Sequence, residues 1–284
     1  MYEQLDPYAI LQTCGVSHAS AVTRVYGGTD TAIWRVESGG EVYALRVFQR
    51  GQQNACLRER KVMQAAQTAG LPVPQVYAVG EWQEYPALLL GWLPGRTVFA
   101  ELRARPWKCW QLGVASGRMH ATIHALPAPD LLLQQPDDWI EWPGSEEAPL
   151  QERLRLIECQ VPALLHMDYH PLNVLTDGKR ITAVLDWRNA CAGVPQADFA
   201  RTASILRVDT IGRPGLFAMG IRRIFEAGWR AGYAEKNRLA EDLSLFYAWS
   251  GAVMERDLAA KRSPEDLARI HKWTLKWKRR AGCL

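Results

Sequence analysis

The segment HMDYHPLNVL at residues 166–175 and the run AVLDW that ends at Trp187 constrain this chain more than any other part of it. They place Asp168 five residues before Asn173, and Asp186 thirteen residues after it. Asp and Asn carry oxygen atoms that bind magnesium, and an Asp can also orient a hydroxyl and accept its proton as it attacks a phosphate. The residue types and their order therefore indicate a phosphoryl-transfer site.

The spacing also predicts local structure. Two short apolar runs on either side of the Asp-Gly turn at residues 177–180 predict a β-hairpin. With this turn, Asn173 faces Val184 across the hairpin, and Asn173 and Asp186 share one face, where both could bind one cation. A slip of one residue would move Asp186 to the other face, so the inference depends on the turn. Pro171 makes the segment before the hairpin a loop rather than a helix.

The alternative reading is a surface hairpin in which Asp and Asn merely cap turns, as these residues often do. For any one of the three residues alone, that reading would be preferred. Three of them at this spacing, with the apolar strands in phase, favour a functional site.

The pattern His166-x-Asp168-x4-Asn173, followed by Asp186-Trp187, resembles the signature of the aminoglycoside phosphotransferase and choline kinase-like family. These are small-molecule kinases with a protein-kinase-like fold. The resemblance implies that Asp168 is the catalytic base, that Asn173 and Asp186 bind Mg2+, and that ATP or GTP is the co-substrate. It implies that His166 is a structural member of the loop. The Asp-Trp pair stands where protein kinases have Asp-Phe-Gly, which favours the small-molecule branch.

The same resemblance implies an α+β, bilobal fold. We expect a nucleotide-binding lobe at residues 1–91, with an antiparallel sheet and one helix, and a hinge at residues 92–96. We expect a mainly helical lobe at residues 97–284 that contains the catalytic loop and the acceptor site. ATP and magnesium would bind in the cleft between the lobes.

Three strands are predicted in the first third, at residues 22–26, 31–36 and 41–48, because β-branched and aromatic residues alternate with glycine turns. The first turn, Gly27-Gly28-Thr29, is a candidate phosphate-binding loop, although two glycines also suit any hairpin.

The third strand carries Arg46 where relatives carry a Lys that pairs with nucleotide phosphates. A guanidinium can also bind phosphate, with different geometry, and a solvent-facing Arg is the alternative. A helix at residues 54–69 follows, and the resemblance makes its Glu59 the partner of this cation; an ordinary exposed Glu is the rival. Leu90 and Trp92 flank the expected hinge, whose backbone groups would bind adenine.

Further along, a helix at residues 107–126 carries His120 and His124 one turn apart. This is the spacing of metal ligands, but no third ligand is evident, so packed or surface histidines are favoured. Asp198 resembles the family's Asp-Leu-Ala element and is expected to support the catalytic loop through buried hydrogen bonds. Helices are also predicted at residues 243–258 and 267–277.

The acceptor is less constrained. Residues 133–149 are acidic, with Asp137, Asp138, Glu141, Glu146 and Glu147, and form either a loop over the acceptor site or a plain solvated loop. An acidic loop would suit a polycationic aminoglycoside, whereas the basic residues near the C-terminus argue against one. Choline-like, sugar and amino-alcohol acceptors stay open.

Composition sets outer limits. The 284 residues suit one large domain or two lobes, and the net charge of +4 does not indicate a nucleic-acid partner. Six scattered cysteines without Cys-x-x-Cys favour thiols in a reducing compartment. We find no apolar run that would span a membrane and no signal pattern, so a cytoplasmic protein is expected.

The alternative functions are a protein kinase and a nucleotide-binding pseudokinase. A protein kinase is disfavoured because no Ala-Pro-Glu segment closes an activation loop. A nucleotide-binding pseudokinase is suggested by Arg46 and the short glycine loop. The expected partners are a nucleoside triphosphate and a small-molecule hydroxyl acceptor, and the oligomeric state is not readable from the sequence.

Overall fold

The computed structural model describes residues 4–25, 31–134, 139–209, 215–238 and 242–284. The chain divides into two compact units, which are described separately. The first unit contains residues 1–94 and 182–188, and the second contains residues 95–181 and 189–284. The predicted α+β class is confirmed, since an antiparallel sheet comes first and helices predominate afterwards.

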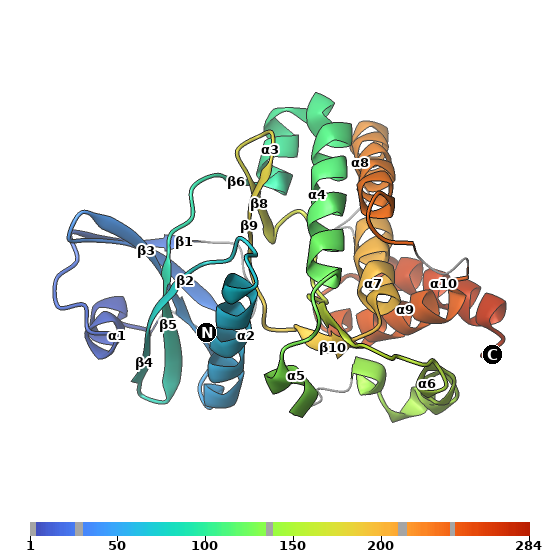
Figure 1. The fold of residues 1–284 in the computed structure, drawn as a ribbon, viewed down its shortest axis with the longest axis horizontal. Helices are drawn as coiled ribbons and strands as arrows, with labels where there is room; N and C mark the ends of the chain where they lie inside the picture. The colour runs from blue at the N-terminus through green and yellow to red at the C-terminus, as the bar shows by residue number, and fades with distance from the viewer. Residues whose placement is uncertain (1–3, 26–30, 135–138, 210–214, 239–241) are drawn as a thin grey trace. The chain divides into compact units, whose positions relative to one another are not determined.

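The first unit is built on a five-stranded antiparallel sheet with the order β1-β2-β3-β5-β4 (Figure 1). Its elements are α1 (Pro7–Thr13), β1 (Ala21–Val25), β2 (Ala32–Ser38), β3 (Glu41–Val47), α2 (Gln53–Thr68), β4 (Val76–Trp82) and β5 (Tyr85–Gly91). The three strands and the helix predicted here are confirmed to within a few residues. Gly39 and Gly40 adopt positive φ in the β2–β3 turn, a conformation that glycine supplies without strain.

The core of this unit lies between the sheet and α1, a helix that the sequence pattern did not predict. Ile10 and Leu11 of α1 pack with Trp34, Leu45 and other buried strand residues. α1 begins at Asp6, whose carboxylate accepts the backbone N–H groups of the first turn.

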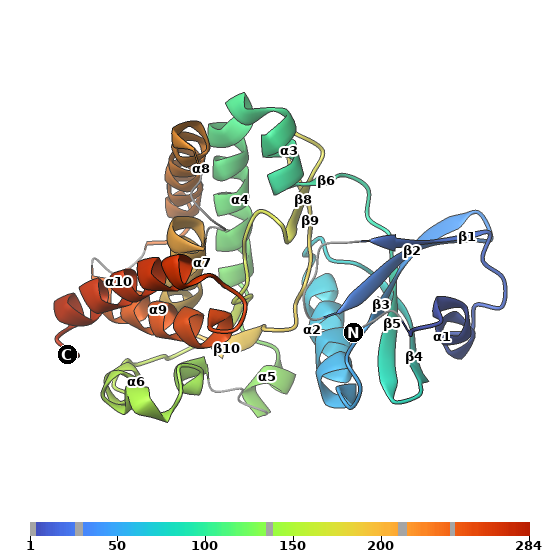
Figure 2. The same cartoon turned by 180° about the vertical axis from the view of Figure 1, so that it is seen from behind.

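The second unit is mainly helical (Figures 1 and 2). Its helices are α3 (Val98–Ala104), α4 (Cys109–His124), α5 (Asp130–Gln134), α6 (Ala148–Arg155), α7 (Pro195–Val208), α8 (Leu216–Ala234), α9 (Ser244–Leu258) and α10 (Pro264–Ala281), with short 3-10 turns at η1 (Pro106–Lys108), η2 (Trp139–Glu141) and η3 (Ser145–Glu147). Its short strands are β6 (Arg96–Thr97), β7 (Ala163–Leu165), β8 (Val174–Thr176) and β10 (Cys191–Gly193), and β9 (Ile181–Val184) continues into the first unit.

α4 and α8 lie side by side in both ribbon views, and their backbones approach each other closely at glycine residues. Each helix has two glycines four residues apart, Gly113 and Gly117 on α4 and Gly228 and Gly232 on α8. A Cβ atom at Gly117 would collide with the Trp229 carbonyl oxygen. The buried face of α4 therefore consists largely of small residues, whereas the apolar Trp110 is half-exposed.

The predicted turn at residues 177–180 is confirmed, and α10 has a capped start. The turn at residues 177–180 is closed by the Asp177 N–H bonding to the Arg180 carbonyl, and the Asp177 carboxylate accepts two further N–H groups. α10 begins at Ser263, whose hydroxyl accepts the Asp266 N–H, with Pro264 as its first residue.

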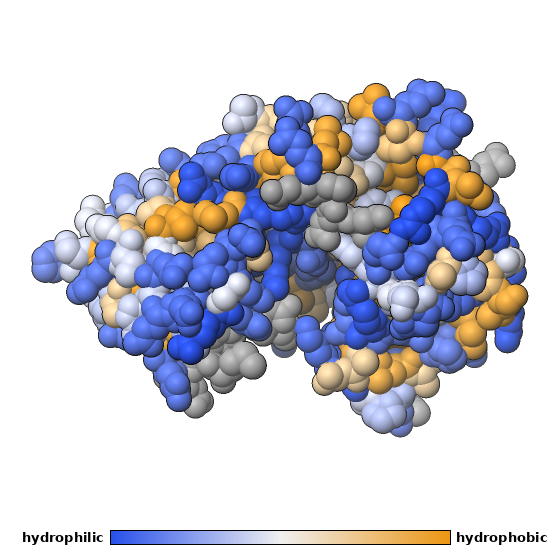
Figure 3. Space-filling model, turned by 90° about the horizontal axis from the view of Figure 1, so that it is seen from below, coloured by the Kyte–Doolittle hydropathy of each residue, from blue (hydrophilic) through white to orange (hydrophobic). Residues whose placement is uncertain are grey.

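The described helices include none that combines the length and the apolar character required to cross a membrane. On the face in Figure 3, apolar residues form separate patches among hydrophilic ones.

Candidate active site

The candidate catalytic loop, residues 166–173, leaves the buried strand β7 and leads into β8. Met167 has φ of +63°, a left-handed conformation that is rare for residues other than glycine. The adjoining His166 is fully buried, and its N–H donates to Asp198 Oδ2 over 2.6 Å. The loop therefore turns sharply just before Asp168 and is fastened there by a buried carboxylate.

Asp168 is held by several neighbours. Its Oδ2 accepts a hydrogen bond from Asn173 Nδ2 at 3.0 Å, and its Oδ1 lies 3.5 Å from His170 Nε2. Its backbone N–H donates to His166 Nδ1 at 3.2 Å. Burial alone would raise the pKa of Asp168, but the charge and hydrogen bond of His170 outweigh burial and lower it to about 2. The side chain is thus an oriented carboxylate, able to accept a hydroxyl proton.

Asn173 presents an oxygen rather than its amide nitrogen to other groups. Its Nδ2 donates to both the backbone carbonyl and the carboxylate of Asp168, so Oδ1 is left as a ligand. Asp186, which lies in the first unit, offers a carboxylate whose side chain is 39% exposed. An amide oxygen and a carboxylate suit a magnesium ion. Their convergence on one ion stays a prediction.

In the first unit, Arg46 of β3 lies between two carboxylates. It donates to Glu59 of α2 over 2.8 Å and to Asp186 over 2.7 Å. Glu59 is only 1% exposed and also accepts the Trp187 N–H. Burial raises the pKa of Glu59 to about 7, although Arg46 and the Trp187 N–H favour its charged form. The solvent-facing alternatives for Arg46 and Glu59 are wrong: both are buried, and they pair as the resemblance implied.

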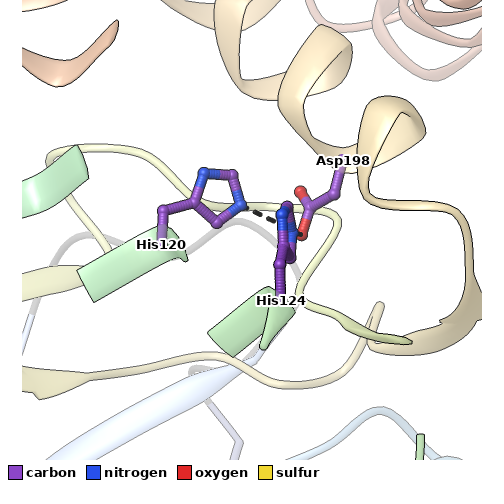
Figure 4. A group of neighbouring side chains, drawn as sticks. All are labelled: His120, His124 and Asp198. Atoms are coloured by element: carbon purple, nitrogen blue, oxygen red, sulfur yellow. Dashed lines mark hydrogen bonds and ion pairs between the residues drawn. The ribbon is translucent and has the colours of Figure 1, made fainter. Parts of the chain in front are cut away.

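The two histidines of α4 meet Asp198 of α7 in the interior of the second unit (Figure 4). His124 Nε2 lies 3.1 Å and His120 Nε2 lies 3.2 Å from Asp198 Oδ2. Their ligand atoms lie within 4.8 Å of one another, so the third group that the sequence did not reveal is Asp198. His124 Nδ1 is already bonded to the Tyr233 hydroxyl, and Asp198 Oδ2 accepts the His166 N–H. The packed-histidine interpretation agrees with this network.

The charges in this cluster follow from burial and contact. Burial lowers the pKa of His120 to about 4, so its ring is neutral near pH 7. Burial would raise the pKa of Asp198, but its contacts with His120 and His124 outweigh that effect and hold it well below its usual range. The buried Asp198 carboxylate thus accepts the backbone N–H that fixes the start of the loop.

Comparison with known proteins shows the family of this chain. The model of the phosphotransferase enzyme family matches residues 21–236. This range includes Asp168, Asn173 and Asp186 as well as the Arg46–Glu59 pair. The chain belongs to the phosphotransferase enzyme family. Homoserine kinase of Pseudomonas aeruginosa is 30% identical over an alignment of 159 positions, and the match covers 47% of this chain and 48% of that protein. The chain therefore spans about half the length of the curated relatives it matches.

Solved structures of other phosphotransferases share the fold. The aminoglycoside phosphotransferase APH(4)-Ia, in a ternary complex with AMP-PNP and hygromycin B, aligns with a TM-score of 0.67 at 19% identity, covering 94% of this chain and 96% of that one. A putative fructosamine-3-kinase from Haemophilus somnus aligns with a TM-score of 0.60 at 13% identity, covering 92% of each chain. The predicted protein-kinase-like fold of the small-molecule branch is thereby confirmed.

The other residues predicted to bind the nucleotide are those of the glycine turn and of the expected hinge. Gly27, Gly28 and Thr29 lie outside the described residues. Leu90 is buried in β5, and Trp92 is partly exposed. The Trp92 N–H donates to the Val42 carbonyl, so this amide is engaged within the unit. A role for Trp92 in binding adenine would have to use its carbonyl or its indole ring.

The acidic stretch at residues 133–149 is not a plain loop. Asp137 and Asp138 lie outside the described residues, but the rest contains η2, η3 and the beginning of α6. Glu141 pairs with Arg155, and Glu147 pairs with Lys278 of α10. These two acids are thus matched by bases of the same unit.

Sequence reasoning missed Arg201 of α7 as a neighbour of the catalytic loop. Its side chain is buried, and its Nε donates to the Met167 carbonyl over 2.7 Å. Its Nη2 lies 3.4 Å from Asp257 Oδ2 of α9, and its guanidinium lies over the Trp142 ring. Its charge also helps to lower the pKa of Asp168. Its position three residues after Asp198, on the same face of a helix, was the available signal.

Proposed function

We propose that the chain transfers the γ-phosphoryl group of ATP, or of GTP, to a hydroxyl group of a small molecule. The observation that carries the proposal is Asp168: an ionised carboxylate fixed by Asn173 and His170 on the loop of a phosphotransferase family member. A carboxylate in this state can orient a hydroxyl and accept its proton as the phosphoryl group leaves the nucleotide.

The other residues have supporting roles in this proposal. Asn173 and Asp186 would hold Mg2+, which supplies neutralisation of phosphate charge when bound. Arg46 would contact the nucleotide phosphates, and Glu59 would keep its guanidinium in place. His166 and Asp198 would hold the loop so that Asp168 keeps its orientation. Rate enhancement would come from positioning and charge neutralisation.

The charges of the acidic residues at 133–149 bear on which acceptors the protein could bind. Of the three described acids in residues 133–149, Glu141 and Glu147 are paired with Arg155 and Lys278, which leaves the exposed Glu146 as the acid that could attract a polycation. We therefore propose a small acceptor of low positive charge. The homoserine kinases of Pseudomonas aeruginosa make hydroxylated amino acids the first compounds to test.

The test uses purified protein with magnesium, ATP or GTP, and a panel of hydroxy amino acids, amino alcohols, sugars and aminoglycosides. We expect Asp168→Asn to lower kcat about 100- to 10,000-fold while ATP binding, measured by calorimetry, persists. Asp130→Asn, at an exposed carboxylate, is the matched control and should leave kcat unchanged. Equal turnover by wild type and Asp168→Asn would show that Asp168 is not the base.

A pseudokinase is the second candidate, because Arg46 binds Asp186, the carboxylate that a magnesium ion would need. If the wild-type protein binds ATP but turns over none of the panel, while Arg46→Lys restores no turnover, the pseudokinase becomes the better proposal.

A further inference from the structure

A small cavity lies beneath the catalytic loop, inside the second unit. Tyr169, His170 and Pro171 of the loop form one side of it, and the helices α4, α7 and α8 contribute the rest. Its volume is about 10 Å3, close to the roughly 10–15 Å3 that a single water molecule needs.

Three polar side chains line this cavity, one from each helix: Ser116 of α4, Thr202 of α7 and Trp229 of α8. All three are at least 98% buried. The Ser116 hydroxyl, the Thr202 hydroxyl and the Trp229 indole N–H have no hydrogen-bond partner among the described residues. Buried polar groups in folded proteins are almost always paired, with protein or with ordered water, because desolvation without a partner is costly.

The three groups have complementary capacities. The Trp229 indole can only donate, whereas each hydroxyl can donate or accept. A water molecule in the cavity would accept from Trp229 and could donate to or accept from a hydroxyl, and buried waters typically make about three such bonds. The remaining lining is mostly apolar and too tight for a larger ligand.

We propose that this cavity binds one structural water molecule, which joins α4, α7 and α8 beneath the catalytic loop. The loop residues above it are tied to the same framework, since the Tyr169 hydroxyl donates to the Ser116 carbonyl over 2.7 Å. The next residue, His170, contacts both Asp168 and Asn173. The bound water is thus part of the platform on which these residues rest.

The sign of the change in Tm on removal of a lining hydroxyl distinguishes a bound water from a dry cavity. Thr202→Val keeps the shape of the side chain and removes only the hydroxyl. If the hydroxyl bonds to water, the variant should lower Tm by about 2–4 °C. If the hydroxyl is unpaired, its removal relieves a desolvation penalty, and Tm should stay constant or rise.

Ser116→Ala is the second variant, with Ser204→Ala as its reference. Ser204 is also a fully buried helical serine, but its hydroxyl donates to the Ala200 carbonyl over 2.8 Å. A loss of Tm in Ser116→Ala similar to that in Ser204→Ala supports the water.

A crystal structure at about 1.5 Å resolution decides directly. We expect a peak of electron density within hydrogen-bond distance of Trp229 Nε1 and both hydroxyls in the wild type. Absence of this peak, or a Tm for Thr202→Val that equals or exceeds that of the wild type, would overturn the proposal.

Discussion

Asp168 of the second unit is held by several neighbours, whereas Glu59 and Asp186 of the first unit share one arginine. In the second unit, Asp168 has contacts with Asn173, His170 and the His166 ring, so its position does not depend on one neighbour. In the first unit, Arg46 alone bridges Glu59 and Asp186. Loss of one contact should therefore disturb Asp168 only slightly. Loss of the Arg46 guanidinium should disturb both of its carboxylate partners.

The largest effect on stability is therefore expected at Arg46. Arg46→Met leaves the carboxylate of Glu59 buried without its cation, and removal of one partner of a buried pair costs about 3–5 kcal/mol. The matched variant in the other unit is Asn173→Ala. It should cost only about 1 kcal/mol, because Asp168 keeps its other contacts. Urea unfolding of both variants measures the difference.

Arg46→Lys is the control, since it retains the charge and loses the forked geometry. It should be more stable than Arg46→Met. If Asn173→Ala destabilises as much as Arg46→Met, the contrast between one shared arginine and several neighbours does not hold.

A smaller effect is expected at Arg201, which joins the Met167 carbonyl to Asp257. Arg201→Lys cannot make both bonds and should cost about 1.5–3 kcal/mol, the range for a hydrogen bond to a charged group. It should also lower kcat without changing the Kd for ATP, since its partners lie in the catalytic loop and α9. Arg256→Lys, at a more exposed arginine beside the same Asp257, is the control. An unchanged kcat in Arg201→Lys would restrict Arg201 to stability alone.

The effect expected at His120 develops only below about pH 6.5, so at pH 7 it is the smallest of these effects. Its pKa is about 4 in the folded protein and roughly 6.5 when unfolded, so the unfolded state takes up its proton first. His120 therefore contributes stability above pH 6.5 that is lost as the pH falls toward 4, with a slope of at most about 1.4 kcal/mol per pH unit.

His120→Phe removes this titration and keeps a ring that can stack on Tyr169. Tm measured between pH 4 and 7 should decline less steeply in the variant than in the wild type. Glu59 titrates in the opposite direction, but it contributes equally to both proteins and cancels. Parallel curves would mean that His120 is not the neutral buried group described above.

Much of the fold followed from local signals in the sequence. The strands around Gly39 and Gly40 and the helix that contains Glu59 have strong periodicity and clear turn residues. α1 and α8 were missed for different reasons. α1 is short and is recognised by its Asp6 cap rather than by a pattern. α8 has a buried apolar stripe of Phe225, Trp229 and Tyr233, but Gly228 and Gly232, which lie against α4, weaken the helical signal in its sequence.

Some residues of the candidate site could be predicted from local sequence, and others could not. The residues of the catalytic loop were readable because they are close together in sequence. Arg201 and the partnership of His120 with Asp198 depend on helices α4 and α7, which are far apart along the chain, and so required the tertiary structure. The ion pairs of the acidic stretch could not be predicted because its partners, Arg155 and Lys278, lie outside it.

The glycine contact between α4 and α8 has a mechanical consequence. Since backbone meets backbone there, a side chain at Gly117 or Gly232 would force the helices apart, and we expect the close packing to resist sliding of one helix against the other. We therefore expect the two helices to move as one body in any conformational change within this unit. Ser116 and Trp229 therefore keep a fixed separation, and the backbone amides of this pair should be among the slowest in the unit to exchange with solvent.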